Sequence, residues 1–290
     1  MKLLAVAVPV LALLAGLAGF PASAHAHAHK PYRTKAPPAA RLALLESGAV
    51  MIQDPKTRAV LYQKNARAVM PIASLTKLMT ALVVLEARQD MAQMLTVTGA
   101  DIDRLKHSSS RLRVGTRLSR SAMLHLALMS SENRAASALG RSYPGATRRF
   151  VAAMNAQARA LGMRNTRYVE PTGLSSANVS TAEDLAKLVV AVEKHALIRR
   201  YSTDRAFTIL QGRQQTAYHN TNRLTASPRW KIRLQKTGYI WEAGRCMVLH
   251  ASVKGRATVM VFLDAQGKFA HAADADRVRS WLTRFNPRQP

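Results

Sequence analysis

The hydrophobic pattern of the chain changes from alternating to helical and back again. Residues 49–53 and 58–62 read as two strands joined by a turn at Asp54-Pro55. After Pro71 the apolar residues recur at steps of three and four, which is the spacing of one face of a helix. This helical pattern covers residues 75–88, 121–139, 147–161 and 181–196.

Strand-like patterns return in the last quarter of the chain. They predict three strands, with Lys254-Gly255 as the turn between the last two, and then a basic amphipathic helix. The three strands cover residues 231–240, 245–253 and 257–264, and the helix covers residues 274–285. Strands, then helices, then strands and one final helix are typical of an α+β fold, in which helices flank an antiparallel sheet and a helical subdomain is inserted mid-chain.

The amino terminus reads as an export signal. Lys2 precedes an apolar run over residues 3–20, and Ala22-Ser23-Ala24 has the small residues of a cleavage site. Pro9 and the many Ala and Gly residues weaken the alternative interpretation, an uncleaved membrane anchor. We therefore expect residues 1–24 to be a cleaved signal peptide and the mature protein to be periplasmic.

A basic segment rich in Pro and His follows the signal, and we assign residues 25–44 to it as a linker. Its alternating histidines lack a nearby carboxylate or thiolate that would complete a metal site, so an exposed linker is the better interpretation. We expect the rest of the chain, residues 45–290, to form a single catalytic domain.

Composition and charge narrow the classes of function. The chain has 290 residues, 48% of them hydrophobic, with 43 Lys and Arg against 16 Asp and Glu and a net charge of +27. This excess favours anionic partners such as nucleic acid, anionic lipid or an acidic polymer. A single cysteine, Cys246, excludes an internal disulfide framework and a multi-cysteine metal site. No glycine-rich phosphate loop is present, so we expect no nucleotide and no other cofactor.

Ser74 and Lys77 form the first candidate for chemistry, at the start of the first predicted helix. Residues three apart share a helix face, so the hydroxyl and the amine can touch. A serine becomes a good nucleophile only when a base takes its proton, and a lysine serves as that base when burial or a second cation lowers its pKa. Free backbone N–H groups at a helix start also favour a developing anion.

Two further clusters resemble parts of the same kind of site. Ser131 and Asn133 offer a hydroxyl that can relay a proton and an amide that can hold a lysine or a substrate amide. Ser176 and Asn178 have the same spacing, so this pattern is ambiguous by itself; a helix cap or a turn is the plain interpretation of both.

The last cluster is Lys236-Thr237-Gly238, with Tyr239 after it, in a predicted strand. A second lysine there would lower the pKa of Lys77 and attract a substrate carboxylate, and the glycine permits close approach of a substrate. In a strand, neighbouring side chains point to opposite faces, and a solvated strand end is the plain interpretation of this cluster alone.

The order and spacing of the three clusters match the S-x-x-K, S-x-N and K-T-G set of penicillin-binding proteins and class A β-lactamases. Position after a helical run selects Ser131 over Ser176. The chain resembles the serine D-Ala-D-Ala peptidase family of low-molecular-mass penicillin-binding proteins, and within it the D-alanyl-D-alanine endopeptidases. The resemblance extends over residues 47–282, and its specific stretches are residues 71–80, 127–136, 170–174, 178–182, 236–239 and 243–246.

The resemblance implies a β-lactamase/transpeptidase-like fold and a set of roles. Ser74 would be acylated, Lys77 would accept its proton, and Ser131 would be the second catalytic serine. The substrate-binding residues would be Asn133, Lys236, Thr237, Gly238 and Tyr239, with the N–H groups of Ser74 and Tyr239 as the oxyanion hole. The expected partners are peptidoglycan peptide stems as substrate and β-lactams as covalent inhibitors, without nucleic acid.

Departures from the family pattern narrow the expected activity. The short chain after Gly238 leaves no room for the second β-domain of many family carboxypeptidases, and we expect the closing helix to pack on the sheet, with at most peripheral membrane contact. Glu170 has Leu174 where class A β-lactamases have Asn, so fast β-lactam hydrolysis is not expected. A D-Ala-D-Ala carboxypeptidase and a non-catalytic wall-binding protein remain as alternatives. Cys246 reads as a buried structural thiol.

Overall fold

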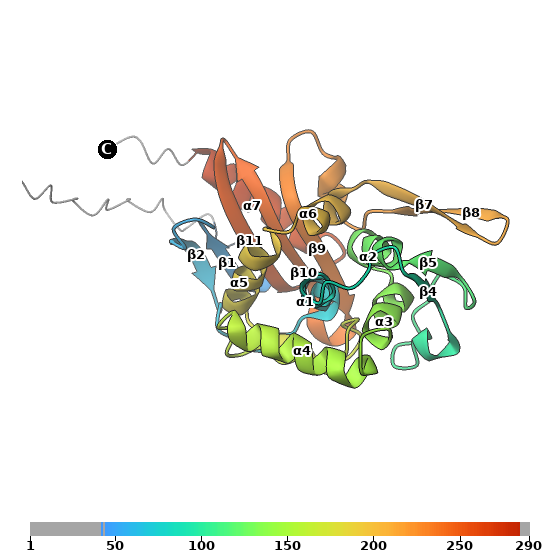
Figure 1. The fold of residues 1–290 in the computed structure, drawn as a ribbon. Helices are drawn as coiled ribbons and strands as arrows, with labels where there is room; N and C mark the ends of the chain where they lie inside the picture. The colour runs from blue at the N-terminus through green and yellow to red at the C-terminus, as the bar shows by residue number, and fades with distance from the viewer. Residues whose placement is uncertain (1–41, 43, 285–290) are drawn as a thin grey trace, which may run out of the picture. The chain divides into compact units, whose positions relative to one another are not determined.

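A five-stranded antiparallel sheet organises the part of the chain that the computed structural model describes, residue 42 and residues 44–284. These residues all lie in the compact unit of residues 36–290. The sheet has the order β2-β1-β11-β10-β9, so β9 is an edge strand (Figure 1). Its strands are β1 (Ser47–Gln53), β2 (Val60–Lys64), β9 (Lys231–Ile240), β10 (Gly244–Val253) and β11 (Arg256–Ala265). The strands predicted from the alternating pattern are all present.

Helices occupy both faces of the sheet, and six of them lie in the segment between β2 and β9 (Figure 1). In the described part of the chain they are α1 (Thr76–Glu86), α2 (Arg120–Met129), α3 (Asn133–Arg141), α4 (Ala146–Ala160), α5 (Ala182–Val192), α6 (Ala196–Thr203) and α7 (Ala270–Arg284). This confirms the predicted α+β class, with a helical block inserted between the first and last strands of the sheet.

Alternating side chains of the sheet belong to two separate cores. On β10, Cys246 and Val248 face the core shared with α1 and α5, whereas Met247 and Leu249 face the core under α7. Val278 and other apolar residues of α7 are buried in this second core, so the closing helix packs on the sheet as expected. It begins at Ala270, four residues earlier than the periodicity suggested.

The predicted helix over residues 121–139 is in fact two helices, and this correction matters for the site. Ser131 adopts a left-handed backbone with φ +60° between α2 and α3, which stops the first helix. The hydroxyl of Ser130 then donates to the carbonyl of Leu126, and the Glu132 side chain caps α3 by accepting from the N–H of Arg134. Apolar residues keep the helical period on both sides of the break, so the pattern does not reveal it.

The sequence pattern missed α6 and the short strands outside the main sheet. These are β3 (Met70–Pro71), β4 (Met94–Thr96), β5 (Arg117–Ser119), β6 (Val179–Ser180), β7 (Ala206–Gln211) and β8 (Gln214–His219). The hairpin of β7 and β8 projects from the helices (Figure 1), and most of its strand residues are exposed or half-buried, which explains the weak signal. It is anchored at its base by His125, whose ring stacks on Tyr201 and on Phe207 at 4.2 Å from the latter.

The predicted signal peptide and residues 25–41 of the predicted linker lie outside the described residues. Leu42 is fully buried in the core under α7. None of the helices in the described ranges is long and apolar enough to pass through a lipid bilayer.

Candidate active site

Ser74 lies in a 3-10 turn, Ala73–Leu75, that leads directly into α1. Ala73 has a left-handed φ of +46°, and its carbonyl accepts a hydrogen bond of 2.8 Å from the hydroxyl of Thr76. Gly173 lies so close that a Cβ on it would be 2.0 Å from the carbonyl oxygen of Ala73. The turn that carries Ser74 is therefore fixed from both sides, by its own helix and by the loop around Gly173.

Lys77 points its amine at three oxygen atoms. Its Nζ lies 2.8 Å from Ser74 Oγ, 2.7 Å from Asn133 Oδ1 and 2.6 Å from the carbonyl oxygen of Thr172. The side chain is almost fully buried. An ammonium donates to all three oxygens, whereas a neutral amine can donate to Asn133 and Thr172 while its lone pair faces the Ser74 hydroxyl. The arrangement therefore suits both protonation states.

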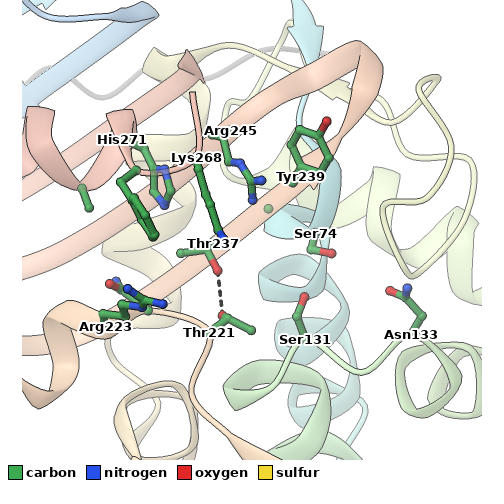
Figure 2. A pocket seen from close by; sticks show the side chains of 14 residues that line it. Ser74, Ser131, Asn133, Thr221, Arg223, Thr237, Tyr239, Arg245, Lys268 and His271 are labelled. Atoms are coloured by element: carbon green, nitrogen blue, oxygen red, sulfur yellow. Dashed lines mark hydrogen bonds between the residues drawn. The ribbon is translucent and has the colours of Figure 1, made fainter. Parts of the chain in front are cut away.

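Ser131 and Lys236 form a second hydroxyl–amine pair in the same place. Lys236 Nζ lies 2.8 Å from Ser131 Oγ and 2.7 Å from the carbonyl oxygen of Thr237. The left-handed backbone of Ser131 turns its side chain into the groove, opposite Ser74 (Figure 2). Two segments that are more than a hundred residues apart thus meet at one point.

Burial is the main influence on the pKa of both lysines. Burial lowers the pKa of Lys77 to about 8, against the opposing charges of Glu170 and Glu132. Burial, and secondly the positive charge of Lys77, hold the pKa of Lys236 well below that of an ordinary lysine. A buried pair of lysines loses one proton more readily than two exposed lysines do. One of the two amines can then be neutral and act as a base.

Asn133 connects this pair to a loop that sequence reasoning missed. It begins α3, accepts from Lys77 and donates its own amide N–H to Ser108 Oγ at 3.1 Å. Ser108 in turn donates to the carboxylate of Asp103 at 2.6 Å. The loop between β4 and β5 thereby orients the Asn133 amide, and no local pattern around Ser108 signals this.

The loop over residues 170–178 contacts Lys77 through the carbonyl oxygen of Thr172. One carboxylate oxygen of Glu170 accepts from the Thr172 N–H and hydroxyl, and the other accepts from the N–H of Gly173 and the amide of Asn178. This network holds the Thr172 carbonyl against Lys77. Asn178 is fully buried within it, while Ser176 is exposed on the loop surface, which agrees with the choice of Ser131 over Ser176.

A groove of about 430 Å³ opens above Ser74, between β9 and the α2–α3 break. Thr237, Gly238 and Tyr239 of β9 line one wall, and Ser131 and Asn133 line the other (Figure 2). The Thr237 hydroxyl is 2.7 Å from that of Thr221, and a Cβ at position 238 would be 2.9 Å from the backbone nitrogen of Ser74. Only a glycine lets β9 pass this close to Ser74.

All eight sequence-predicted site residues thus meet at this groove or directly beneath it. The alternation of the strand does not separate Lys236 from Thr237, because Lys236 is buried and reaches Ser131 while Thr237 lines the open wall.

Cys246 is fully buried away from the groove lining, and burial raises the pKa of its thiol to about 12, as expected for a structural residue. Among residues 44–284, no cluster of three or more His, Cys, Asp or Glu could hold a metal ion.

Comparison with known proteins agrees with this geometry. The family model described as D-alanyl-D-alanine carboxypeptidase matches residues 34–267. A D-alanyl-D-alanine endopeptidase of Pseudomonas aeruginosa is 47% identical over 251 residues, which are 85% of this chain and 81% of the relative. The Escherichia coli protein of the same name is 45% identical over 240 residues, which are 82% and 77% of the two chains.

Solved structures show the same fold. A DD-transpeptidase of Streptomyces superposes with a TM-score of 0.76 at 28% identity, over 82% of this chain and 97% of that one. The predicted β-lactamase/transpeptidase-like architecture is therefore confirmed. Fold, sequence match and the serine-lysine arrangement together show that this chain belongs to the D-alanyl-D-alanine carboxypeptidase family of serine peptidases.

Proposed function

We propose that this enzyme is a DD-endopeptidase that hydrolyses D-Ala-diaminopimelate cross-links of peptidoglycan through an acyl-serine intermediate. The observation that carries the proposal is the 2.8 Å contact between Ser74 Oγ and the buried amine of Lys77. A hydroxyl in contact with a desolvated amine is an activated nucleophile. The named endopeptidase relatives support the choice of substrate.

In the proposed first step, Ser74 Oγ attacks the carbonyl carbon of the D-Ala that precedes the scissile bond, and its proton passes to the neutral amine of Lys77. The tetrahedral oxyanion lies near the N–H groups of Ser74 and Tyr239, where β9 runs against the Ser74 turn. The C–N bond then breaks, and the leaving amine takes a proton through Ser131, which Lys236 holds at 2.8 Å. Water releases the acyl group and restores Ser74.

The groove walls provide the proposed substrate contacts. β9 is an edge strand, so its free backbone edge can pair with an extended peptide stem. The Asn133 amide faces the stem on one side, and Thr237 lies beside the carboxylate of the leaving residue on the other. β-lactams, whose strained amide resembles the scissile bond, would acylate the same serine.

A D-Ala-D-Ala carboxypeptidase is the second candidate, because the family model and a Bacillus subtilis relative with 30% identity carry that name. The catalytic residues would serve either reaction. A β-lactamase is disfavoured because both carboxylate oxygens of Glu170 already accept hydrogen bonds within their own loop. The residue four positions after Glu170 is Leu174, whose apolar side chain cannot hold a hydrolytic water.

We further propose that the enzyme is exported, with cleavage near Ala24, and works in the periplasm. The apolar run and small-residue site at the amino terminus support export, and the wall substrate is found only outside the inner membrane. The proposed partners are peptide stems and β-lactams, with at most peripheral membrane contact.

A fluorescent penicillin tests the chemistry. We expect covalent labelling of the wild-type protein and none of Ser74→Ala, while Ser176→Ala, a change at an exposed loop serine, labels normally. Mass spectrometry of cross-linked muropeptide dimers after digestion tests the substrate, and monomer products are expected. An unlabelled wild type, or labelling that survives Ser74→Ala, would contradict the acyl-serine mechanism.

A further inference from the structure

The groove carries an excess of positive charge that the proposed mechanism does not use. Its lining residues include the cations Arg223, Arg245 and Lys268 and also His271, and none of the described residues that line it is acidic. With 43 basic against 16 acidic residues, an unpaired surface cation is common in this chain. Arg245 stacks on Tyr239, with its guanidinium carbon 4.2 Å from the ring centre. Arg223 and Lys268 differ from it because the two share a second aromatic ring.

Arg223 and Lys268 both lie over one aromatic ring. The Arg223 guanidinium carbon is 4.8 Å from the centre of the Phe269 ring, and Lys268 Nζ is 5.5 Å from it. Phe269 is half exposed, at 49%. Cation–π contacts favour these positions without neutralising the charges, so both cations remain available to an anion. We call Arg223, Lys268 and Phe269 the Phe269 shelf.

The shelf lies on the Thr237 side of the groove. Lys268 extends its amine toward Thr237, and Arg223 follows Thr221, the residue whose hydroxyl contacts that of Thr237 (Figure 2). The first turn of α7, with His271 and Ala272, lines the same end, so a helix amino terminus adds to the positive potential there. His271 Nδ1 is buried without a hydrogen-bond partner at this end of the groove.

Charge identifies which part of a substrate lies on this side. In a D-Ala-D-Ala or cross-linked stem, the residue that leaves carries a carboxylate next to the scissile amide, so the cationic end of the groove is the leaving-group side. A leaving D-Ala has this one carboxylate only. A leaving stem peptide has the same carboxylate and further ones several bonds away, which extend beyond Thr237 toward the shelf.

We propose that the Phe269 shelf is a carboxylate subsite for the second stem peptide of a cross-link, and that Arg223 and Lys268 select cross-linked substrate over a free D-Ala-D-Ala terminus. This inference rests on the proposed peptidase activity and deepens it. The shelf is a specificity determinant: it contacts a distant part of the leaving group and takes no part in bond breaking.

The test compares two substrates in the full-length enzyme. We expect Arg223→Gln and Lys268→Gln each to lower kcat/KM for a cross-linked muropeptide dimer about 10-fold, and to lower it at most about 2-fold for a monomeric pentapeptide stem. Arg223→Lys keeps the charge and should recover part of the loss. Lys56→Gln removes the same charge at the exposed β1–β2 turn and is the matched control.

A modified substrate makes the test sharper. A dimer whose more distant leaving-stem carboxylates are amidated should be cleaved about 10-fold more slowly by the wild type and with little further loss by Arg223→Gln, because both changes remove the same contact. Equal losses on dimer and pentapeptide, no loss on either, or additive effects of amidation and substitution would each overturn the inference. Failure of the wild type to be labelled by penicillin would overturn the proposed function itself, which is a separate result.

Discussion

At the scale of single residues, the site depends on how many hydrogen bonds each lysine amine can make. Lys77 has three oxygen neighbours, of which Asn133 and Thr172 offer only acceptors and Ser74 offers a hydroxyl that can also donate. Loss of one proton therefore leaves no orphaned acceptor, since the hydroxyl turns to donate to the amine. Burial makes this loss easier by penalising the charged form.

The pH dependence of acylation follows from this arrangement. Lys77 is an ammonium below its pKa of about 8 and a neutral base above it, so the rate of acylation by penicillin should rise with pH through this range. Because the negative charge of Glu132 raises the pKa of Lys77, Glu132→Gln should move the rise to lower pH. Stopped-flow acylation between pH 6 and 10 measures both, with Lys56→Gln as the control. A rate that falls with pH across this range would contradict a lysine base.

The site residue Ser131 has a strained backbone conformation. Its left-handed φ of +60° costs an L-residue about 1 kcal/mol relative to glycine. We expect Ser131→Gly to be about 1 kcal/mol more stable toward urea than Ser131→Ala, because glycine relieves the strain and both lose the hydroxyl. Both variants should acylate far more slowly than the wild type. Equal stability of the two variants would show that the backbone at this position is not strained.

At the scale of elements, the site is built where elements stop. The break between α2 and α3 presents Ser131 and Asn133, the turn before α1 presents Ser74, and the edge strand β9 presents Lys236 to Tyr239. Two of these three parts are held by loops outside the regular elements. The loop around Gly173 holds the Ser74 turn, and the loop around Ser108 holds the Asn133 amide.

Gly173 tests how tightly the Ser74 turn is held. In Gly173→Ala, the new Cβ would be 2.0 Å from the Ala73 carbonyl oxygen at a φ of +84°, and we expect a loss of about 3 kcal/mol in unfolding free energy. Acylation by the folded fraction should also slow, because the turn must move. Gly162→Ala is the control: its φ is +69° with open space around it, so a cost of about 1 kcal/mol is expected and no effect on acylation. Equal effects of the two substitutions would refute the close packing of Gly173.

The difference between regular elements and loop contacts also decides how much of the structure the sequence predicts. Periodicity predicts every strand of the main sheet and most helices, because these elements bury one face and the pattern records which face. It joins α2 and α3 into one helix, since a left-handed residue such as Ser131 leaves no mark on an apolar period. The clusters around Ser74, Ser131 and Lys236 are visible as spacings, whereas Ser108 and Thr221 are not, because their roles depend on contacts between distant loops.

At the scale of the whole molecule, the sheet separates the core beneath the active site from a second core under α7. The core beneath the site joins α1, α2, α3 and α5 to one face of the sheet, and the core under α7 lies on the other. The first turn of α7 and the two residues before it nevertheless line the groove, through His271, Lys268 and Phe269. The carboxyl-terminal helix thus both stabilises the sheet and contributes the cationic end of the groove.

The charge of the molecule as a whole should act on the wall polymer over a longer range than the groove does. With a net charge of +27, the protein attracts a polymer that carries free carboxylates, and salt screens this attraction over about 10 Å at 0.1 M. We expect the amount of Ser74→Ala protein that pellets with isolated sacculi to fall at least about 5-fold between 50 and 300 mM NaCl. Acylation of the wild type by penicillin should change less than about 2-fold over the same range, because the buried lysines are screened far less. Salt-independent pelleting would show that recognition resides in the groove alone, and an equal loss of acylation would show that salt disturbs the site itself.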